Sequence, residues 1–333
     1  MMSILVTGGT SALGRRVVRE LAGLGEELVL LVPPGADLGG LPERAVRVVP
    51  GDVANLDDVG GAMVGASAVV HLAALETPSR AAPERYRAVN VTGLKNVIQV
   101  ASFGAIERIL YTSTVLVLGD GGGGEPGDEN RQPANPVPRS PWLQSRTEAL
   151  RLALDQMSQG VPLIALYPGL LYGPGREREG GFTTRMLAAL AAGELRAIGG
   201  PGDRRWCHAF VDDVARGHRL AFERGEPGAS YVLGGPNATL DEWLATASRV
   251  TGQPLPRIRV PYQLARLWAV AEATRARLFG ATPRQILAPI ELMRRSWAFS
   301  SGRAIDQLAY RESPLEEGMR RTLDAWRAAP TTR

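Results

Sequence analysis

Short apolar segments alternate with stretches of helical periodicity through the first half of the chain. Ile4-Leu5-Val6 is followed by Gly8-Gly9, and a helical pattern then runs through Val17, Val18 and Leu21. Similar apolar runs follow at residues 28–32, 46–49, 68–72, 109–112 and 163–167. Continuous apolar strands separated by helices are typical of a parallel sheet that is covered on both faces. The pattern predicts a doubly wound parallel sheet of the α/β class.

The first connection between strand and helix has the composition of a phosphate-binding turn. It reads TGGTSALG from Thr7 to Gly14 and lies where backbone N–H groups and the helix dipole can hold a pyrophosphate. Gly8 permits a tight turn and Gly14 permits close packing of helix on strand, but Ser11 occupies the central position. The turn predicts a dinucleotide site, with an ordinary glycine turn as the alternative.

Composition excludes several classes of protein. The 333 residues are 44% hydrophobic and 22% charged and include one cysteine, which excludes a disordered chain and a disulfide scaffold. No apolar run reaches the roughly 18 residues of a spanning helix, and the first residues do not resemble a signal peptide. We therefore expect a cytoplasmic protein with no membrane partner.

Charge and metal-binding residue types exclude two further classes. The net charge is +4, but the arginines are scattered among acids without interleaved aromatics, so we expect no nucleic-acid partner. His71, Cys207, His208 and His218 have no metal-ligand spacing, which predicts no metal site.

Several further segments occur in an order that resembles the extended short-chain dehydrogenases/reductases. This superfamily contains the NAD-dependent epimerases/dehydratases and the 3β-hydroxysteroid dehydrogenases. The resemblance covers nearly the whole chain and rests, besides the first turn, on residues 51–53, 70–74, 90–93, 111–119, 172–175, 211–215 and 233–236. It implies a Rossmann-type sheet, a nicotinamide cofactor and a small-molecule substrate, and it makes a homodimer an expectation.

The resemblance also assigns a set of cofactor-binding residues. Asp52 would bond the adenine amino group, and residues 72–74 would lie beneath the pyrophosphate and ribose. The full predicted set is Gly8, Thr10, Ser11, Ala12, Leu13, Gly14, Asp52, Val53, Leu72, Ala73, Ala74, Thr112, Arg146 and Pro168.

The choice between NAD and NADP stays open. The second strand ends in Val32-Pro33-Pro34, which has neither an acid for a ribose 2′-OH nor an arginine for a 2′-phosphate. Asp37 could serve the first purpose and Arg15 the second.

The catalytic segment departs from the pattern of these enzymes. There a Tyr transfers the proton, a Lys four residues later binds the nicotinamide ribose, and a Ser or Thr orients the substrate oxygen. In residues 140–149, Trp142 replaces the Tyr and Arg146 replaces the Lys. An indole N–H only donates and cannot perform acid–base catalysis, whereas a guanidinium can still bind ribose hydroxyls. Thr114, five residues before Gly119, stands where the oxygen-orienting residue is expected.

Three residues are candidates to replace the missing phenol. Tyr172 and Tyr167 are expected near the cleft, and Glu76 follows the fourth strand on the substrate side. Each has a structural or solvated role as its alternative. The predicted catalytic set is Thr114, Trp142, Arg146 and Tyr172.

The alternation of predicted strands and helices is less regular in the second half of the chain. Residues 120–141 are rich in Gly and Pro and predict a long loop, and residues 239–327 are mostly helical in pattern. We expect a dinucleotide-binding domain at 1–170, to which 206–235 return. A smaller, mostly helical substrate domain is expected at 171–205 and 236–330.

The helical part carries the clues to a substrate. The stripe Leu264, Leu267, Trp268 and Ala271, followed by Leu278, is interpreted as core. Residues 297–310 resemble the tail of the steroid-dehydrogenase-like branch and favour an apolar small molecule, although Arg176, Arg204 and Arg205 could equally bind a phosphate.

Three functions remain compatible with the sequence. The first is an NAD(P)-dependent oxidoreductase acting on a carbonyl or hydroxyl with an atypical proton transfer. The second is a non-redox catalyst on the same fold, such as a cyclase, lyase or isomerase. The third is a non-catalytic nucleotide-binding protein.

Overall fold

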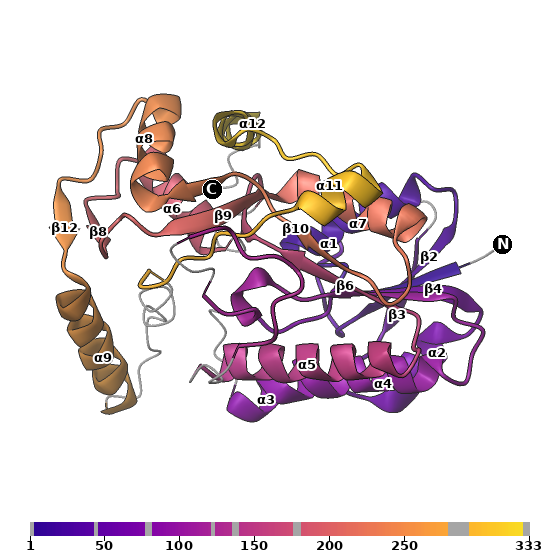
Figure 1. The fold of residues 1–333 in the computed structure, drawn as a ribbon. Helices are drawn as coiled ribbons and strands as arrows, with labels where there is room; N and C mark the ends of the chain where they lie inside the picture. Colours follow the sequence, from indigo (N-terminus) through magenta and orange to yellow (C-terminus); the bar gives the residue numbers. More distant parts are fainter. Residues whose placement is uncertain are drawn as a thin grey trace.

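A seven-stranded parallel sheet forms the centre of the molecule (Figure 1). The computed structural model describes residues 3–42, 46–76, 82–120, 124–134, 140–175, 181–278 and 293–328. The strand order is β10-β6-β5-β4-β1-β2-β3, and all neighbouring strands are parallel. The strands are β1 Ser3–Thr7, β2 Glu27–Val32, β3 Val46–Pro50, β4 Ala66–His71, β5 Arg108–Thr112, β6 Leu163–Pro168 and β10 Ser230–Leu233. The predicted doubly wound, Rossmann-type sheet is confirmed.

Helices cover both faces of this sheet, because successive side chains of each strand point to opposite faces and both sets are apolar. On one face lie α2 Leu56–Met63, α3 Pro83–Arg87, α4 Gly93–Ala101 and α5 Pro141–Ser158, with the π-helical turn η1 Ala88–Thr92 joining α3 to α4. On the other lie α1 Ala12–Ala22, α7 Val211–Arg224 and α11 Gly302–Leu308. The two faces form two separate hydrophobic clusters.

A second, three-stranded sheet and several helices are built from the rest of the chain. Its order is β11-β9-β7, with β7 Leu170–Tyr172, β9 Arg205–Phe210 and β11 Asn237–Thr239. Around it lie α6 Phe182–Ala191, α8 Leu240–Thr251 and α12 Leu315–Ala328. A short parallel pair, β8 Ala197–Gly199 and β12 Ile258–Val260, leads to α9 Tyr262–Leu278.

Helix α9 lies at one end of the molecule, away from the main sheet (Figure 1). It packs on its neighbours through the small residues Ala265 and Ala269. Leu264, Leu267 and Trp268 are exposed, so the prediction that this stripe belongs to the core is wrong. Periodicity shows that a helix has an apolar face, but it does not show what covers that face.

Candidate cofactor and active site

The turn between β1 and α1 requires glycine at two positions. Gly8 has φ +75°, and a Cβ there would lie 2.5 Å from the backbone nitrogen of Ala73. A Cβ on Gly14 would lie 2.1 Å from the Gly8 carbonyl oxygen. Ser11 caps α1, since its hydroxyl accepts a hydrogen bond from the Gly14 N–H at 3.0 Å. The turn is therefore tight, and no acidic residue lies in the first turn of α1 to oppose an anion.

The segment after β4 is held against this turn by a buried histidine. His71 Nδ1 lies 2.7 Å from Thr7 Oγ1, which also accepts a hydrogen bond from the Ala73 N–H at 3.3 Å. Burial, and then the charge of Arg146, lower the pKa of His71 to about 3. This neutral side chain fixes residues 72–74 beside Gly8, which is a positioning role.

Asp52 lies at the end of β3, where an adenine ring is expected. One carboxylate oxygen accepts from the Ala54 N–H at 3.0 Å, and the other pairs with Arg85 at 2.7 Å. Burial raises the pKa of Asp52, but these two partners outweigh it and the net pKa is lowered. A carboxylate has about four lone-pair sites, so further acceptor capacity remains.

The two residues that could determine the preference for NAD or NADP contact each other. Arg15, on α1, lies 3.5 Å from the Asp37 carboxylate and donates to the Asp37 carbonyl at 2.8 Å. It also donates to the Gly39 carbonyl. The acid that could bind a ribose hydroxyl thus neutralises the arginine that could bind a phosphate.

The first turns of α5 bring Trp142 and Arg146 to the carboxyl edge of the sheet. Pro141 starts the helix, and both side chains are buried. Arg146 Nη2 donates to the Ser113 carbonyl at 2.9 Å and lies 3.6 Å from the Glu76 carboxylate. The carboxyl edge of a doubly wound sheet is where such folds bind ligands.

An asparagine that the sequence analysis did not single out ties this region together. Asn90, in η1, donates to Ser145 Oγ at 2.9 Å and accepts from the Leu75 N–H at 2.7 Å. Ser145 donates in turn to the Trp142 carbonyl at 2.8 Å. The first turn of α5 is therefore fixed to the segment that carries Glu76.

Two buried polar atoms in the first turns of α5, Trp142 Nε1 and Arg146 Nε, have no hydrogen-bond partner among the described residues. The buried hydroxyls of Tyr111 and Ser113 lie nearby and interact with each other. More than 90% of buried polar groups in proteins are paired, so two unpartnered donors one helical turn apart are unusual. Burial raises the pKa of Tyr111, and the charge of Arg146 opposes this rise. The residues present fit a bound group with several hydroxyls, such as a nicotinamide ribose.

The other predicted site residues have varied positions. Thr114 directly follows Ser113 and caps a short 3-10 helix, where its Oγ1 accepts from the Leu116 N–H at 3.3 Å. The Thr112 hydroxyl pairs with His218 at 2.9 Å on the α7 face. Pro168 ends β6.

The structure does not bring Tyr172 to Trp142 and Arg146. Its hydroxyl donates to the Leu315 carbonyl at 3.4 Å, at the start of α12, which lies far from α5 in Figure 1. Burial and the charge of Asp213 raise its pKa. Tyr167 is also engaged elsewhere, since it donates to Ser230 Oγ at 3.3 Å and burial raises its pKa to about 12.

The arginines considered for a phosphate do not converge either. Arg204 pairs with Asp203 at 3.5 Å, and Arg205 donates to the Asn237 carbonyl at 3.4 Å. Arg176 lies outside the described residues.

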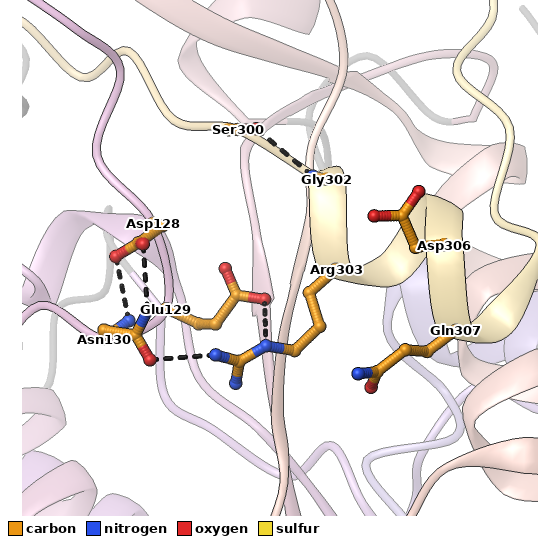
Figure 2. Close-up of a pocket in the computed structure, with 8 residues that line it drawn as sticks. All are labelled: Asp128, Glu129, Asn130, Ser300, Gly302, Arg303, Asp306 and Gln307. Atoms are coloured by element: carbon orange, nitrogen blue, oxygen red, sulfur yellow. Dashed lines mark hydrogen bonds and ion pairs between the residues drawn. The ribbon is translucent and has the colours of Figure 1, made fainter.

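A separate polar cavity of about 390 Å³ lies between residues 128–130 and α11 (Figure 2). The buried Glu129 carboxylate lies 3.3 Å from Arg303 Nε, and Arg303 Nη2 donates to Asn130 Oδ1 at 2.8 Å. These side chains pair with one another and connect the loop to α11, so we assign no ligand to this cavity.

Two of the predicted absences concern features of the part of the chain that the structure describes. Within these ranges, no helix is long and apolar enough to cross a membrane. No group of three or more His, Cys, Asp or Glu side chains in this part of the chain could hold a metal ion.

Comparison with known proteins places this architecture in a family. Residues 4–234 match the model of the NAD dependent epimerase/dehydratase family. A putative dihydroflavonol 4-reductase of Synechocystis sp. is 28% identical over 327 residues, which are 94% of this chain and 91% of that protein. The human 3 beta-hydroxysteroid dehydrogenase type 7 is 34% identical over 246 residues, 69% of this chain and 66% of that enzyme.

A solved structure agrees with the fold over the full length. The crystal structure of gox2253 has a TM-score of 0.83 and 29% sequence identity, and the match covers 98% of both chains. The chain therefore belongs to the NAD-dependent epimerase/dehydratase family, within the extended short-chain dehydrogenases/reductases, and its cofactor is a nicotinamide dinucleotide.

Proposed function

We propose that the protein is an NAD(P)-dependent oxidoreductase that acts on a carbonyl or hydroxyl of a small, apolar molecule. The relatives support this proposal by name, because one is a reductase and the other a dehydrogenase of hydroxysteroids. A hydroxysteroid combines an apolar ring system with one reacting oxygen. We further propose that residues 1–170 with 206–235 bind the cofactor, and that 171–205 with 236–330 bind the substrate.

The observation that carries the proposal is the group of unpartnered polar atoms around Arg146. They lie at the same edge of the sheet as the Gly8–Gly14 turn, between β5 and α5. A bound dinucleotide would supply the missing hydrogen-bond partners there. A protein that had lost its cofactor would have no reason to keep the buried Trp142 Nε1 and Arg146 Nε unpaired, because each costs about 1–3 kcal/mol.

The residues have distinct proposed roles. When bound, the cofactor donates or accepts a hydride. Arg146 holds the ribose hydroxyls, and Thr114 directs the substrate oxygen. Trp142 forms an apolar wall with one N–H donor and takes no part in proton transfer.

The proton must therefore come from another group. The Glu76 carboxylate is half exposed and lies 3.6 Å from Arg146, so we assign the transfer to Glu76, directly or through a water.

The indole of Trp142 also favours a second function, which is non-redox catalysis. A fold that has replaced its acid–base phenol could perform a cyclisation, elimination or isomerisation with the cofactor as a structural part. This alternative predicts product formation without any change in nicotinamide absorbance, whereas the oxidoreductase predicts equal amounts of oxidised cofactor and reduced substrate.

Titration with NADH and NADPH, followed by nicotinamide fluorescence, tests the site. The variants are Ser11→Asp and Ser11→Asn, because both side chains cap a helix well but only Asp adds a negative charge beside the pyrophosphate. We expect Ser11→Asn to bind within about threefold of the wild type, and Ser11→Asp to bind at least about tenfold more weakly.

Thermal melting of both variants serves as the folding control, since a charged cap stabilises α1. Failure of the wild type to bind either nucleotide would overturn the proposal. Equal weakening of nucleotide binding by Ser11→Asp and Ser11→Asn would show that the pyrophosphate of the cofactor does not lie beside this turn.

A further inference from the structure

The Arg16 side chain joins the part of the chain proposed to bind the cofactor to the part proposed to bind the substrate. It lies on α1, one turn after Ala12, and is only 14% exposed. Its Nη1 donates to the Ala12 carbonyl at 3.0 Å, and its Nη2 donates to the Pro174 carbonyl. Its Nε donates to Asp212 Oδ1 at 2.6 Å, at the start of α7. One guanidinium therefore connects the first turn of α1 to residues 172–175, at the end of β7.

The C-terminal helix α12 binds the same segment. Trp326 Nε1 donates to the Gly175 carbonyl at 3.0 Å, and the Tyr172 hydroxyl donates to the Leu315 carbonyl at 3.4 Å. A Cβ on Gly318 would lie 2.2 Å from the Tyr172 hydroxyl, so glycine is what allows the helix to approach this closely. The two ends of α12 thus contact the segment that Arg16 binds.

Charges also connect Arg16 to α12. Asp212 Oδ2 lies 3.3 Å from Nη2 of Arg321, a residue of α12. The Arg321 guanidinium lies over the Phe210 ring, 4.6 Å from its centroid. Asp212 is therefore shared by two arginines, and the three side chains together carry a net charge of +1. Arg16 brings this positive charge to the first turn of α1, where the pyrophosphate of a dinucleotide is expected.

We propose that Arg16 is a positioning residue that couples cofactor binding to the docking of α12 on residues 172–175. The inference rests on the proposed function, because it needs a pyrophosphate at the Gly8–Gly14 turn. Negative charge at that turn favours the rotamer in which the guanidinium lies against α1, and this rotamer is the one that binds Pro174. The coupling is reciprocal, so a variant that loosens α12 should also weaken cofactor binding.

A second ion pair between the same two helices provides a matched comparison. Arg219 Nε, on α7, lies 3.1 Å from Glu20 Oε2, one turn further along α1. Its other ion pair is with Glu223, within α7, at 3.4 Å. Among the described residues, no bond joins Arg219 to residues 172–175. Loss of this pair therefore tests what a merely structural link between α1 and α7 contributes.

Hydrogen–deuterium exchange of the full chain tests the coupling. It is measured with and without saturating dinucleotide, using whichever of NADH and NADPH binds more tightly. In the wild type we expect the dinucleotide to slow exchange in α12 at least about threefold. In Arg16→Gln, at a dinucleotide concentration that still saturates the site, the slowing should fall below about 1.5-fold. Arg219→Gln should keep the slowing of the wild type.

The reciprocal test starts from α12, which contains no predicted cofactor residue. Trp326→Phe keeps an aromatic ring but removes the donor to the Gly175 carbonyl. It should raise the Kd for the dinucleotide about threefold, measured by nicotinamide fluorescence. Trp268→Phe is the matched control, since Trp268 is 52% exposed on α9, and it should not change the Kd. Circular dichroism checks that all variants are folded.

The outcomes distinguish this inference from the proposed function. Binding of the dinucleotide without slower exchange in wild-type α12 would overturn the inference and leave the proposed function standing. The same holds if Arg16→Gln keeps the full slowing, or if Trp326→Phe has a lower melting temperature but an unchanged Kd, because α12 would then have only a structural role. Failure of the wild type to bind either dinucleotide would overturn both.

Discussion

Position 142 determines which chemistry α5 can contribute. An indole is a large ring with one polar hydrogen, and it has no group that can transfer a proton in acid–base catalysis. The helix keeps Trp142 buried and holds it through the Ser145 bond to its carbonyl. The side chain can therefore shape the surface beside Arg146 but cannot transfer a proton.

Asp37 and Arg15 together should set the cofactor preference. Asp37→Ala removes an acceptor for a ribose 2′-OH and leaves the Arg15 guanidinium bonded only to two backbone carbonyls, so that no carboxylate neutralises its charge toward a 2′-phosphate. We expect the ratio of the Kd for NADH to the Kd for NADPH to rise at least about tenfold, measured by nicotinamide fluorescence.

Arg15→Ala is the opposite variant and should lower the same ratio. An unchanged ratio in both variants would show that the ribose end of the cofactor does not reach this pair.

Site residues that are close to one another in the sequence could be predicted from it. Site residues that the fold brings together from different helices and strands could not. Trp142 and Arg146 stand one turn apart on a helix, so their motif is visible in the chain. Asn90, Tyr111 and Ser113 join this region through contacts between η1, β5 and α5. All three lie in segments that carry the family resemblance, but a long-range contact leaves no local pattern, and therefore only the structure shows that they meet.

The helix α8 begins with a reciprocal pair of hydrogen bonds that can be tested. The Glu242 N–H donates to Thr239 Oγ1 at 3.1 Å, and the Thr239 N–H donates to Glu242 Oε2 at 2.8 Å. Thr239→Ala should lower the free energy of unfolding by about 1 kcal/mol, measured by urea denaturation.

Thr251→Ala provides the comparison at the other end of α8. Its hydroxyl donates to the Ala247 carbonyl within the helix and accepts from the Gln253 N–H at 3.3 Å, but it satisfies none of the N–H groups in the first turn, so its loss should cost less than about 0.5 kcal/mol. If the two variants were equally stable, the pair at Thr239 would contribute little to α8.

The elements of the main sheet were predictable because their apolar runs are continuous and separated by helices. The exposure of the apolar stripe on α9 could not be predicted from the sequence. Its stripe has the same periodicity as a buried helix, and no amino-acid pattern distinguishes a face covered by protein from one left exposed.

The molecule as a whole should lose stability in mild acid. Burial lowers the pKa of His71 and His208 to about 3 and that of His218 to about 4. In the unfolded chain each titrates near pH 6.5, so below that pH the unfolded state binds more protons than the folded state. The free energy of unfolding is greatest above about pH 6.5 and should fall by about 2 kcal/mol per histidine by about pH 5.

Urea denaturation at about pH 7.5 and about pH 5 measures this loss. In His218→Gln the fall between the two pH values should be smaller by about one third, because one of the three buried histidines is absent. A free energy of unfolding that does not change with pH would contradict the prediction.

The order of strands in the main sheet also sets a sequence of events during synthesis. Strand β10 covers the outer edge of β6, yet the ribosome makes it only after β7 and β9. Until then β6, whose six residues are all buried in the finished protein, presents an open row of backbone groups. A nascent chain that pauses between residues 172 and 230 therefore offers an apolar edge to other nascent chains, and its yield depends on how quickly translation or a chaperone carries it past this stage.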